Sequence, residues 1–352
     1  MANKVTGSTD ASGALTTIPK AVKSVLVIGK VKGEATDKTI KEKEIFAITG
    51  TADATAVFGS ESITQKIVRT LIAGGCDNIR GIVVPATGET ALADALEVTM
   101  SDNTIRCIVA DNNDTATVSA VKDHLVVAES NDKFRYACFA PSAENTASQT
   151  KLTAYAKTID CDRIFIPGAT LLQSNAEADP QVIAAGLAAA IMTETDDPAL
   201  PLNGVTLKGF NGMQRTMLES EMNALANAGV TPIYMEGSTP AIFRLVTSKI
   251  DDKVWQEGTT RFIADYVLES NETLLRANYK RTKNVVRILN AIRDDIKINM
   301  EKMAGLEIIE NWDEATLTVS KDPQDLYGAL VDYEFDVVTP LYTITIRQHM
   351  KL

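Results

Sequence analysis

The sequence is poor in side chains that bind transition metals or titrate near neutral pH. It has two histidines and four cysteines in 352 residues. The cysteines form no CxxC pair, and His124 has no cysteine at ligand spacing. We therefore expect no metal site and no cofactor, and we expect the cysteines to be buried as small hydrophobic side chains.

Long apolar runs and an excess of positive charge are also missing. No window approaches the roughly 20 apolar residues that cross a bilayer, and residues 1–20 lack the apolar core of a secretory signal. We therefore expect a protein of the cytosol with no direct membrane contact. Acidic residues outnumber basic ones by 46 to 35, and the formal net charge is −11. Because binding to nucleic acid needs clustered positive charge, nucleic acid is not an expected partner.

Sequence motifs of catalysis and nucleotide binding are absent as well. There is no GxxxxGK[ST] phosphate loop, no GxSxG nucleophile turn and no HExxH zinc helix. Residues 25–33 suggest a dinucleotide turn after a strand, but Val31 stands where GxGxxG requires glycine. Acid pairs such as Asp196 and Asp197 lie in polar contexts that would not raise a carboxyl pKa. We therefore predict that the protein is not an enzyme.

The sequence does contain a regular alternation of β-branched runs and helical patterns. Apolar runs begin at residues 79, 105, 134 and 163, spacings that match the length of a βα unit. Helical patterns are expected at 91–100, 116–128, 148–159 and 180–192, and earlier strands at 25–28 and 45–48. The predicted fold class is α/β of mixed α+β character, with a parallel-rich sheet covered on both faces. A mixed C-terminal domain and extended terminal arms complete the prediction.

Composition divides the chain into four parts. Residues 1–20 have few large apolar side chains and are expected to be an N-terminal linking arm. The α/β domain is expected at 21–197, and a proline- and glycine-rich interruption at 195–204 predicts a boundary to a second domain at 198–340. After Pro340, residues 341–352 alternate as a strand with an unpaired edge and are expected to be a C-terminal linking arm.

The second domain is expected to be mixed. The patterns predict helices at 215–227, 260–268 and 272–304, the last broken near 278–282, and strands at 232–235, 241–246 and 331–337. Residues 272–304 carry eight basic and four acidic side chains in an acidic protein. Two interpretations stay open for this stretch, a solvated helix face and a surface that docks onto an acidic protein.

Several segments, taken in order, resemble one family. Near the N-terminus, residues 52–60 contain a Phe58-Gly59 turn before a helix. Further segments are 201–205, 218–230, the Arg- and Thr-containing strand 241–248, the helix 262–267, the long helix with Asn284, and the closing strand 340–346. Together they resemble contractile tail sheath proteins of bacteriophages and phage-tail-like (R-type) bacteriocins. Residues 90–195 show no specific sheath motif and are expected to be a variable, partly outward-facing insertion.

The resemblance implies a structural subunit that polymerises as stacked, commonly hexameric, rings around an inner tube and contracts to drive the tube through a target envelope. It implies as partners further copies of the chain, an inner tail tube protein, and baseplate and tail-terminator proteins. It also implies assembly in the cytoplasm of a bacterial host into a virion tail or a released bacteriocin particle. Sheath subunits are linked by terminal arms that add strands to neighbouring sheets.

The resemblance assigns roles to residues at the ends and in the basic stretch of this chain. The arm residues are Leu15, Thr17, Ile18, Tyr342, Ile344 and Ile346. The candidate tube-facing residues are Lys280, Arg281, Lys283 and Arg287, with the turn at 322–327 as the other candidate. The alternative from a different class is a soluble α/β enzyme with a ligand site at the carboxyl ends of the strands in residues 79–166, where parallel sheets bind ligands.

Overall fold

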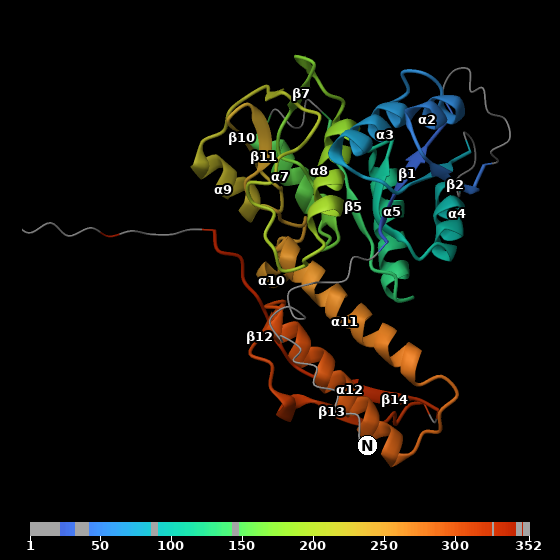
Figure 1. Cartoon of the computed structure of the whole chain (residues 1–352). Helices are drawn as coiled ribbons and strands as arrows, with labels where there is room; N and C mark the ends of the chain where they lie inside the picture. The colour runs from blue at the N-terminus through green and yellow to red at the C-terminus, as the bar shows by residue number, and fades with distance from the viewer. Residues whose placement is uncertain are drawn as a thin grey trace, which may run out of the picture. The chain divides into compact units, whose positions relative to one another are not determined.

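The structure is a computed structural model that describes residues 22–31, 42–85, 91–142, 148–325, 327–342 and 347. The described chain forms two compact units (Figure 1). Unit 1 contains residues 196–200 and 262–340, and unit 2 contains residues 22–195, 201–261 and the chain from Leu341. This division differs from the expected boundary near 195–204. Residues 201–261 stay with unit 2 because their backbone pairs with the chain after the main sheet: Thr231 donates to Ile166, and Ser248 donates to Ile164.

Unit 2 is built on a six-stranded sheet with the strand order β2-β3-β1-β4-β5-β6. The strands are β1 (Ser24–Gly29), β2 (Ile45–Ile48), β3 (Ile79–Val83), β4 (Ile105–Ala110), β5 (Tyr136–Cys138) and β6 (Ile164–Phe165). All neighbours run parallel except β2, which pairs antiparallel with β3 at the edge. The predicted parallel-rich sheet is therefore confirmed.

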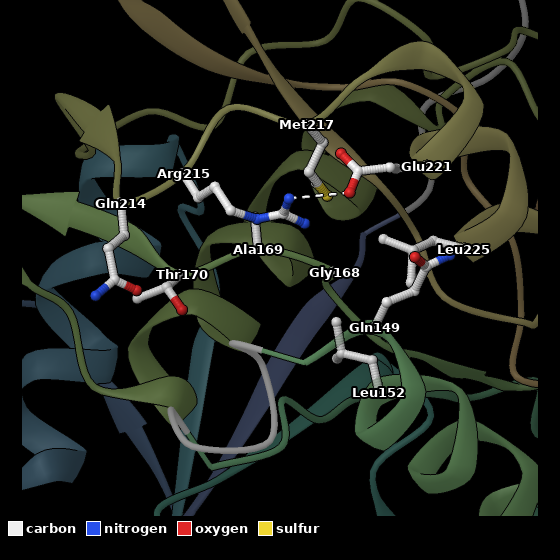
Figure 2. A pocket seen from close by; sticks show the side chains of 10 residues that line it. All are labelled: Gln149, Leu152, Gly168, Ala169, Thr170, Gln214, Arg215, Met217, Glu221 and Leu225. Carbon is white, nitrogen blue, oxygen red and sulfur yellow. Dashed lines mark hydrogen bonds and ion pairs between the residues drawn. The ribbon is translucent and has the colours of Figure 1, made fainter.

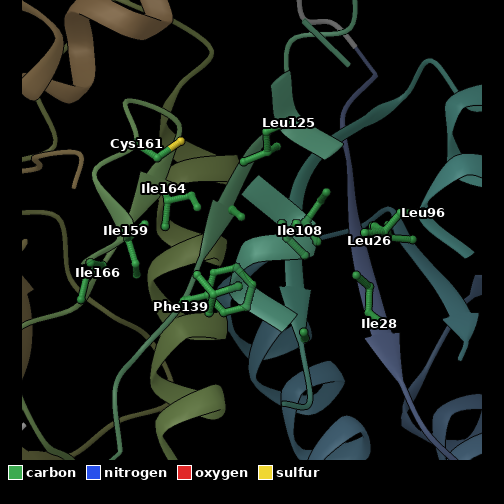
Figure 3. Close-up of a cluster of buried hydrophobic side chains, with 14 of the residues drawn as sticks. Leu26, Ile28, Leu96, Ile108, Leu125, Phe139, Ile159, Cys161, Ile164 and Ile166 are labelled. Atoms are coloured by element: carbon green, nitrogen blue, oxygen red, sulfur yellow. The ribbon is translucent and has the colours of Figure 1, made fainter. Parts of the chain in front are cut away.

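Helices cover both faces of this sheet. They are α2 (Thr51–Phe58), α3 (Ile63–Gly74), α4 (Ala91–Val98), α5 (Thr115–Glu129), α7 (Gln149–Ile159) and α8 (Pro180–Glu194). On one face, Leu26 and Ile28 of β1 belong to a buried cluster with side chains of α4, α5 and α7 (Figure 3). The alternate residues Val25 and Val27 are also fully buried, and α3 and α8 pack against β1. A strand buried on both faces explains why β1 consists almost entirely of apolar residues.

The alanine-rich helix α8 packs closely against α3. A Cβ added to Gly74 would lie 2.3 Å from the Cβ of Ala189, so only a glycine permits this approach. Gly29 has a similar role at the end of β1, where a Cβ would lie 2.5 Å from Thr64 Oγ1 and 2.8 Å from the Phe58 ring. The glycine that suggested a dinucleotide turn is thus explained by packing against α2 and α3.

The remaining elements of unit 2 follow β6 in the chain. They are β7 (Leu171–Gln173), β8 (Ala176–Glu177), β9 (Gly212–Met213), α9 (Glu219–Asn227), β10 (Ile233–Glu236), β11 (Thr239–Ile242) and α10 (Lys253–Gln256). β7, β8 and β9 form a small antiparallel sheet, and β10 and β11 form a hairpin. A short 3-10 turn, η1 (Thr99–Ser101), extends α4.

Unit 1 contains most of α11 (Gly258–Asn278), the whole of α12 (Val286–Gly305), and two small sheets. β12 (Ile309–Glu310) pairs with β15 (Asp336–Val337), and β13 (Thr318–Lys321) pairs with β14 (Ala329–Asp332). The 3-10 turn η2 (Glu314–Thr316) lies between β12 and β13. The core of this unit joins Ile263 of α11 with Ile292, Ile296 and Met300 of α12.

Two expectations for this part of the chain need correction. The expected gap between a helix at 260–268 and one at 272–304 is wrong, because one helix runs through it to Asn278, whereas the break expected near 278–282 is confirmed, since the next helix starts at Val286. No glycine or proline interrupts residues 268–272, whereas Arg281 has φ +59° and Val285 is extended. The strand expected at 331–337 is split between β14 and β15, although its apolar residues are half-buried and its acids exposed, as the alternation predicts.

A search of the described helices finds none that is long and apolar enough to cross a membrane. Across the same part of the chain, no three His, Cys, Asp or Glu side chains are grouped so that they could hold a metal ion. Cys107, Cys138 and Cys161 are buried, and burial raises the pKa of the partly buried Cys76 to about 12.

Candidate functional site: assembly surfaces

The candidate tube-facing residues lie on the loop between α11 and α12 and on the first turn of α12. Lys280, Arg281, Lys283 and Arg287 are all exposed, and none forms an ion pair with any residue that the structure describes. We call these four residues the basic loop. Asn284, within the loop, donates from Nδ2 to the carbonyl of Gly328 at 2.8 Å, which ties the loop to the turn between β13 and β14.

Two of the other three basic residues of α12 are paired with acids of unit 1, whereas Lys302 is exposed and has no ion pair with any described residue. Arg293 and Lys297 both contact Glu314, at 3.3 and 2.5 Å, and Lys297 also lies 3.9 Å from Glu301. Arg276 of α11 is paired with Glu272 at 3.6 Å. Of the eight basic residues in 272–304, three are thus paired, and four of the five unpaired ones lie in the basic loop.

Two further features distinguish the basic loop from the rest of α12. Its positive charges adjoin the N-terminus of α12, where the helix dipole disfavours cations by about 0.3–1 kcal/mol each. Val286 is 69% exposed and Val285 is 42% exposed, and Tyr327, next to Gly328, is 88% exposed. An anionic partner with some apolar surface would relieve both the electrostatic and the solvation cost.

A cavity of about 320 Å³ in unit 2 provides one test of the enzyme alternative (Figure 2). It is lined by Gln149, Leu152, Gly168, Ala169, Thr170, Gln214, Arg215, Met217, Glu221 and Leu225. Arg215 Nη1 donates to Glu221 Oε1 at 2.9 Å, and the backbone N–H of Leu218 donates to Glu221 Oε2 at 2.9 Å. The Leu218 bond, and then Arg215, lower the pKa of Glu221, so this carboxylate is unsuited to be a general acid.

The carboxyl end of β4 is one of the strand ends at which the enzyme alternative would bind a ligand. Burial raises the pKa of Asp111, which directly follows β4. Its Oδ2 accepts hydrogen bonds from the backbone N–H of Lys30 at 2.8 Å and from Thr64 Oγ1 at 3.3 Å. Asp114 caps α5 by accepting from the backbone N–H of Thr117. Both carboxylates thus hold loops and helices together.

Comparisons with known proteins favour the sheath interpretation over the enzyme alternative. A family model described as the phage tail sheath protein central domain matches residues 85–248. This part of the chain is similar to a phage tail sheath domain. No curated protein sequence matches the chain.

Solved structures place nearly the whole chain in the same fold. The helical sheath of the anti-feeding prophage in its contracted state covers 94% of each chain, with a TM-score of 0.73 and 14% identity. The sheath tail protein of Listeria innocua covers 94% of this chain and 95% of its own, with a TM-score of 0.71 and 10% identity. The sheath tail protein of Desulfitobacterium hafniense covers 92% of this chain and 95% of its own, with a TM-score of 0.70 and 8% identity. The predicted resemblance to contractile tail sheaths is confirmed.

One expectation about the sheath domain was wrong. Residues 90–195 were expected to lack sheath motifs, yet the family model covers them together with residues up to 248. This range contains β4, β5 and β6 and continues through β11. The matched range therefore follows the second half of the main sheet and the chain that pairs with it, and residues 201–248 of this range belong to unit 2.

Most of the predicted arm residues of the sheath fold fall outside the described residues. These are Leu15, Thr17, Ile18, Ile344 and Ile346, whereas Tyr342 is described. Tyr342 lies in unit 2, where its ring packs against Arg244 and its hydroxyl bonds Glu257. Arg244 was expected only as part of the strand 241–248, and Glu257 was not identified from the sequence. Nothing in the local sequence of either residue indicates a contact with residue 342.

Proposed function

We propose that this protein is the repeating subunit of a contractile sheath, a structural protein that acts without catalysis. The observation that carries the proposal is the sheath-domain match at residues 85–248 within a chain that shares the sheath fold over more than nine tenths of its length. Copies of the chain would form stacked hexameric rings around an inner tube in the cytoplasm of a bacterial host. Contraction would be a rigid-body rearrangement of this lattice, driven by the difference in stability between two packings.

The terminal arms would link the subunits. We propose that residues 1–20 and 341–352 add strands to neighbouring sheets, as Leu15, Thr17, Ile18, Tyr342, Ile344 and Ile346 were assigned to do. Main-chain hydrogen bonds would supply the affinity, and alternate apolar side chains would enter the neighbour's core. Such links can persist while the bodies of the subunits rotate, because the arms are single chain segments.

The basic loop would dock onto an acidic surface of the inner tube. Four unpaired cations beside exposed Val285, Val286 and Tyr327 support this role. Exposed charge pairs are worth about 1 kcal/mol or less each, so the contact would be weak and sensitive to salt. A weak contact suits a surface that must release the tube during contraction.

Electron microscopy of the purified full-length chain tests the proposed function. We expect rings, tubes or contracted polysheaths, and a protein that remains a monodisperse monomer over a wide concentration range would contradict the proposal. A chain that lacks residues 341–352 should fold but no longer polymerise. Normal tubes from that truncation would rule out strand exchange through the C-terminal arm.

Charge reversal tests the role of the basic loop. Replacing Lys280, Arg281 and Lys283 with glutamate should weaken assembly on a preformed inner tube more than self-assembly. The matched control replaces Arg69, Lys157 and Lys208, three exposed cations of unit 2, and changes the net charge by the same amount. Equal effects of the loop variant on both kinds of assembly, or equal effects of the two triple variants, would refute tube docking.

A further inference from the structure

Tyr342 is held by two charged residues from different parts of unit 2. Its hydroxyl donates to Glu257 Oε1 at 2.5 Å, and the guanidinium carbon of Arg244 lies 4.9 Å from the centroid of its ring. Arg244 in turn donates to Glu257 Oε2 from Nη2 at 2.9 Å and from Nε at 3.1 Å. Each of the three side chains therefore contacts the other two, and the Glu257 carboxylate has both oxygens occupied.

The backbone around Arg244 and Glu257 is fixed without any contribution from Tyr342. Val246 and Glu257 form an antiparallel bridge, and Thr247 donates to the carbonyl of Gln256 at 2.8 Å. Gly258 donates to the carbonyl of Leu245, and its missing Cβ would lie 2.9 Å from that side chain. The two charged side chains thus stand on a rigid frame that is ready to receive an aromatic ring and a hydroxyl group.

The surrounding residues show that the contact is specific to Tyr342. Leu341, the preceding residue, is 70% exposed, whereas Glu257 is only 7% exposed. Burial, and then the charge of Glu257, raise the pKa of the Tyr342 phenol, so it stays protonated and continues to donate at physiological pH. A cation–π contact with a partly desolvated Arg adds to a charge-assisted hydrogen bond, and both would be lost if the side chain left.

We propose that Arg244 and Glu257 form a socket for Tyr342 that fixes the point from which the C-terminal arm leaves the subunit. The chain passes from unit 1 to unit 2 between Pro340 and Leu341, and the socket holds the next residue. When a neighbouring subunit pulls on the arm, Arg244 and Glu257 would transmit the force to the backbone of unit 2. The role in assembly rests on the proposed sheath function, whereas the socket does not.

Chymotrypsin cleavage after residue 342 measures how readily Tyr342 leaves the socket, because the protease must itself bind the ring that the socket holds. When opening is fast, the cleavage rate follows the population of the open state. Tyr342→Phe removes the hydroxyl and keeps the ring, and Glu257→Gln removes the charge of the acceptor. We expect each variant to be cleaved at least about tenfold faster than the unmodified full-length chain, since bonds to charged groups are among the stronger ones. Peptides of residues 338–347 with Tyr or Phe correct for protease preference.

Tyr234 provides the matched control. Its hydroxyl donates to Glu236 Oε2 at 2.6 Å in the same unit, but both residues lie outside the socket. Tyr234→Phe should leave cleavage after residue 342 unchanged. Cleavage of Tyr342→Phe within twofold of the unmodified chain would overturn the socket, as would an equal acceleration by Tyr234→Phe.

Polymerisation of Tyr342→Ala then tests the role in assembly. We expect it to form tubes at least severalfold more slowly than the unmodified chain while Tyr234→Phe keeps the normal rate. Normal tube formation by Tyr342→Ala would overturn the arm-fixing role even if the cleavage result supports the socket. If the unmodified chain forms no tubes, the proposed sheath function fails, and the cleavage assay still decides whether the socket exists.

Discussion

His124 should make the stability of unit 2 depend on pH between about 7 and 5. The side chain is 7% exposed on α5, and its Nε2 lies 2.9 Å from Nη1 of Arg135, whose side chain is fully buried. Arg135 also donates to the carbonyls of Thr99 and Asp102 and to the hydroxyl of Thr99. A guanidinium can only donate, so Nε2 must accept, and the imidazole must be neutral. Burial, and then the charge of Arg135, lower the pKa of His124 from 6.5 to about 4.

The sign and the size of the effect follow from linkage. Between pH 6.5 and 4 the unfolded chain binds a proton at His124 that the folded chain does not, so the free energy of unfolding falls as pH falls. With these two pKa values the loss between pH 7 and pH 5 is about 2 kcal/mol. For a unit of this size, 2 kcal/mol corresponds to a melting temperature lower by roughly 4–8 °C.

Urea unfolding at pH 7, 6 and 5, followed by tryptophan fluorescence, measures this loss. Trp312 lies in unit 1 and Trp255 in unit 2, so a Trp312→Phe background leaves a single reporter in the unit that contains His124. His124→Gln keeps an acceptor for Arg135 and should remove most of the pH dependence. His349→Gln, at the other histidine of the chain, is the control and should leave it unchanged. An equal pH dependence in His124→Gln and the unmodified protein would refute the neutral, buried histidine.

Two further predictions concern stability. Glu129 accepts hydrogen bonds from the buried Arg163 at 2.7 and 3.2 Å, and the Glu129 side chain is 40% exposed. In urea unfolding, Glu129→Gln should therefore lower the free energy of unfolding by only about 1–2 kcal/mol, and the control Glu236→Gln, at an exposed residue, by less than about 0.5 kcal/mol. Equal losses in the two variants would contradict a stabilising role of the Glu129–Arg163 pair. Gly74→Ala should lower the free energy of unfolding by about 1–3 kcal/mol because its Cβ would meet Ala189. Adding Ala189→Gly should partly restore the loss, and the control Gly50→Ala, with open space around it, should change stability little. Additive effects at Gly74 and Ala189 would rule out the contact.

The main sheet could be predicted from the sequence because its signal is local. β2 was predicted with its exact bounds, β1 within one residue at each end, and β3 and β4 with their exact first residues, since each is a short apolar run between polar segments. The continuity of α11 was missed because several polar residues near Ser270 weaken the helical stripe. Asn271 there is buried, and its Nδ2 donates to Tyr333 Oη at 3.1 Å, a contact across 62 residues.

The domain boundary shows why composition alone misplaces units. The prolines and the glycine at 195–204 do interrupt regular structure, but they mark only a short excursion of residues 196–200 into unit 1. The chain then returns to unit 2 and pairs through Thr231 and Ser248 with the backbone around β6. Backbone hydrogen bonds between segments so far apart leave no pattern in either one, since every residue except proline offers the same donor and acceptor.

The two proposed assembly surfaces also differ in how far the sequence indicates them. A count of charges locates the positive stretch at 272–304. In the structure Glu314, far along the chain, pairs with Arg293 and Lys297, so most of the unpaired positive charge of this stretch lies in the basic loop. The socket for Tyr342 depends on Glu257, 85 residues away, and on Arg244, and all three belong to ordinary-looking segments. Charge composition can therefore indicate where the proposed docking surface lies. The place where an arm is fastened depends on tertiary pairing, and only the folded chain reveals it.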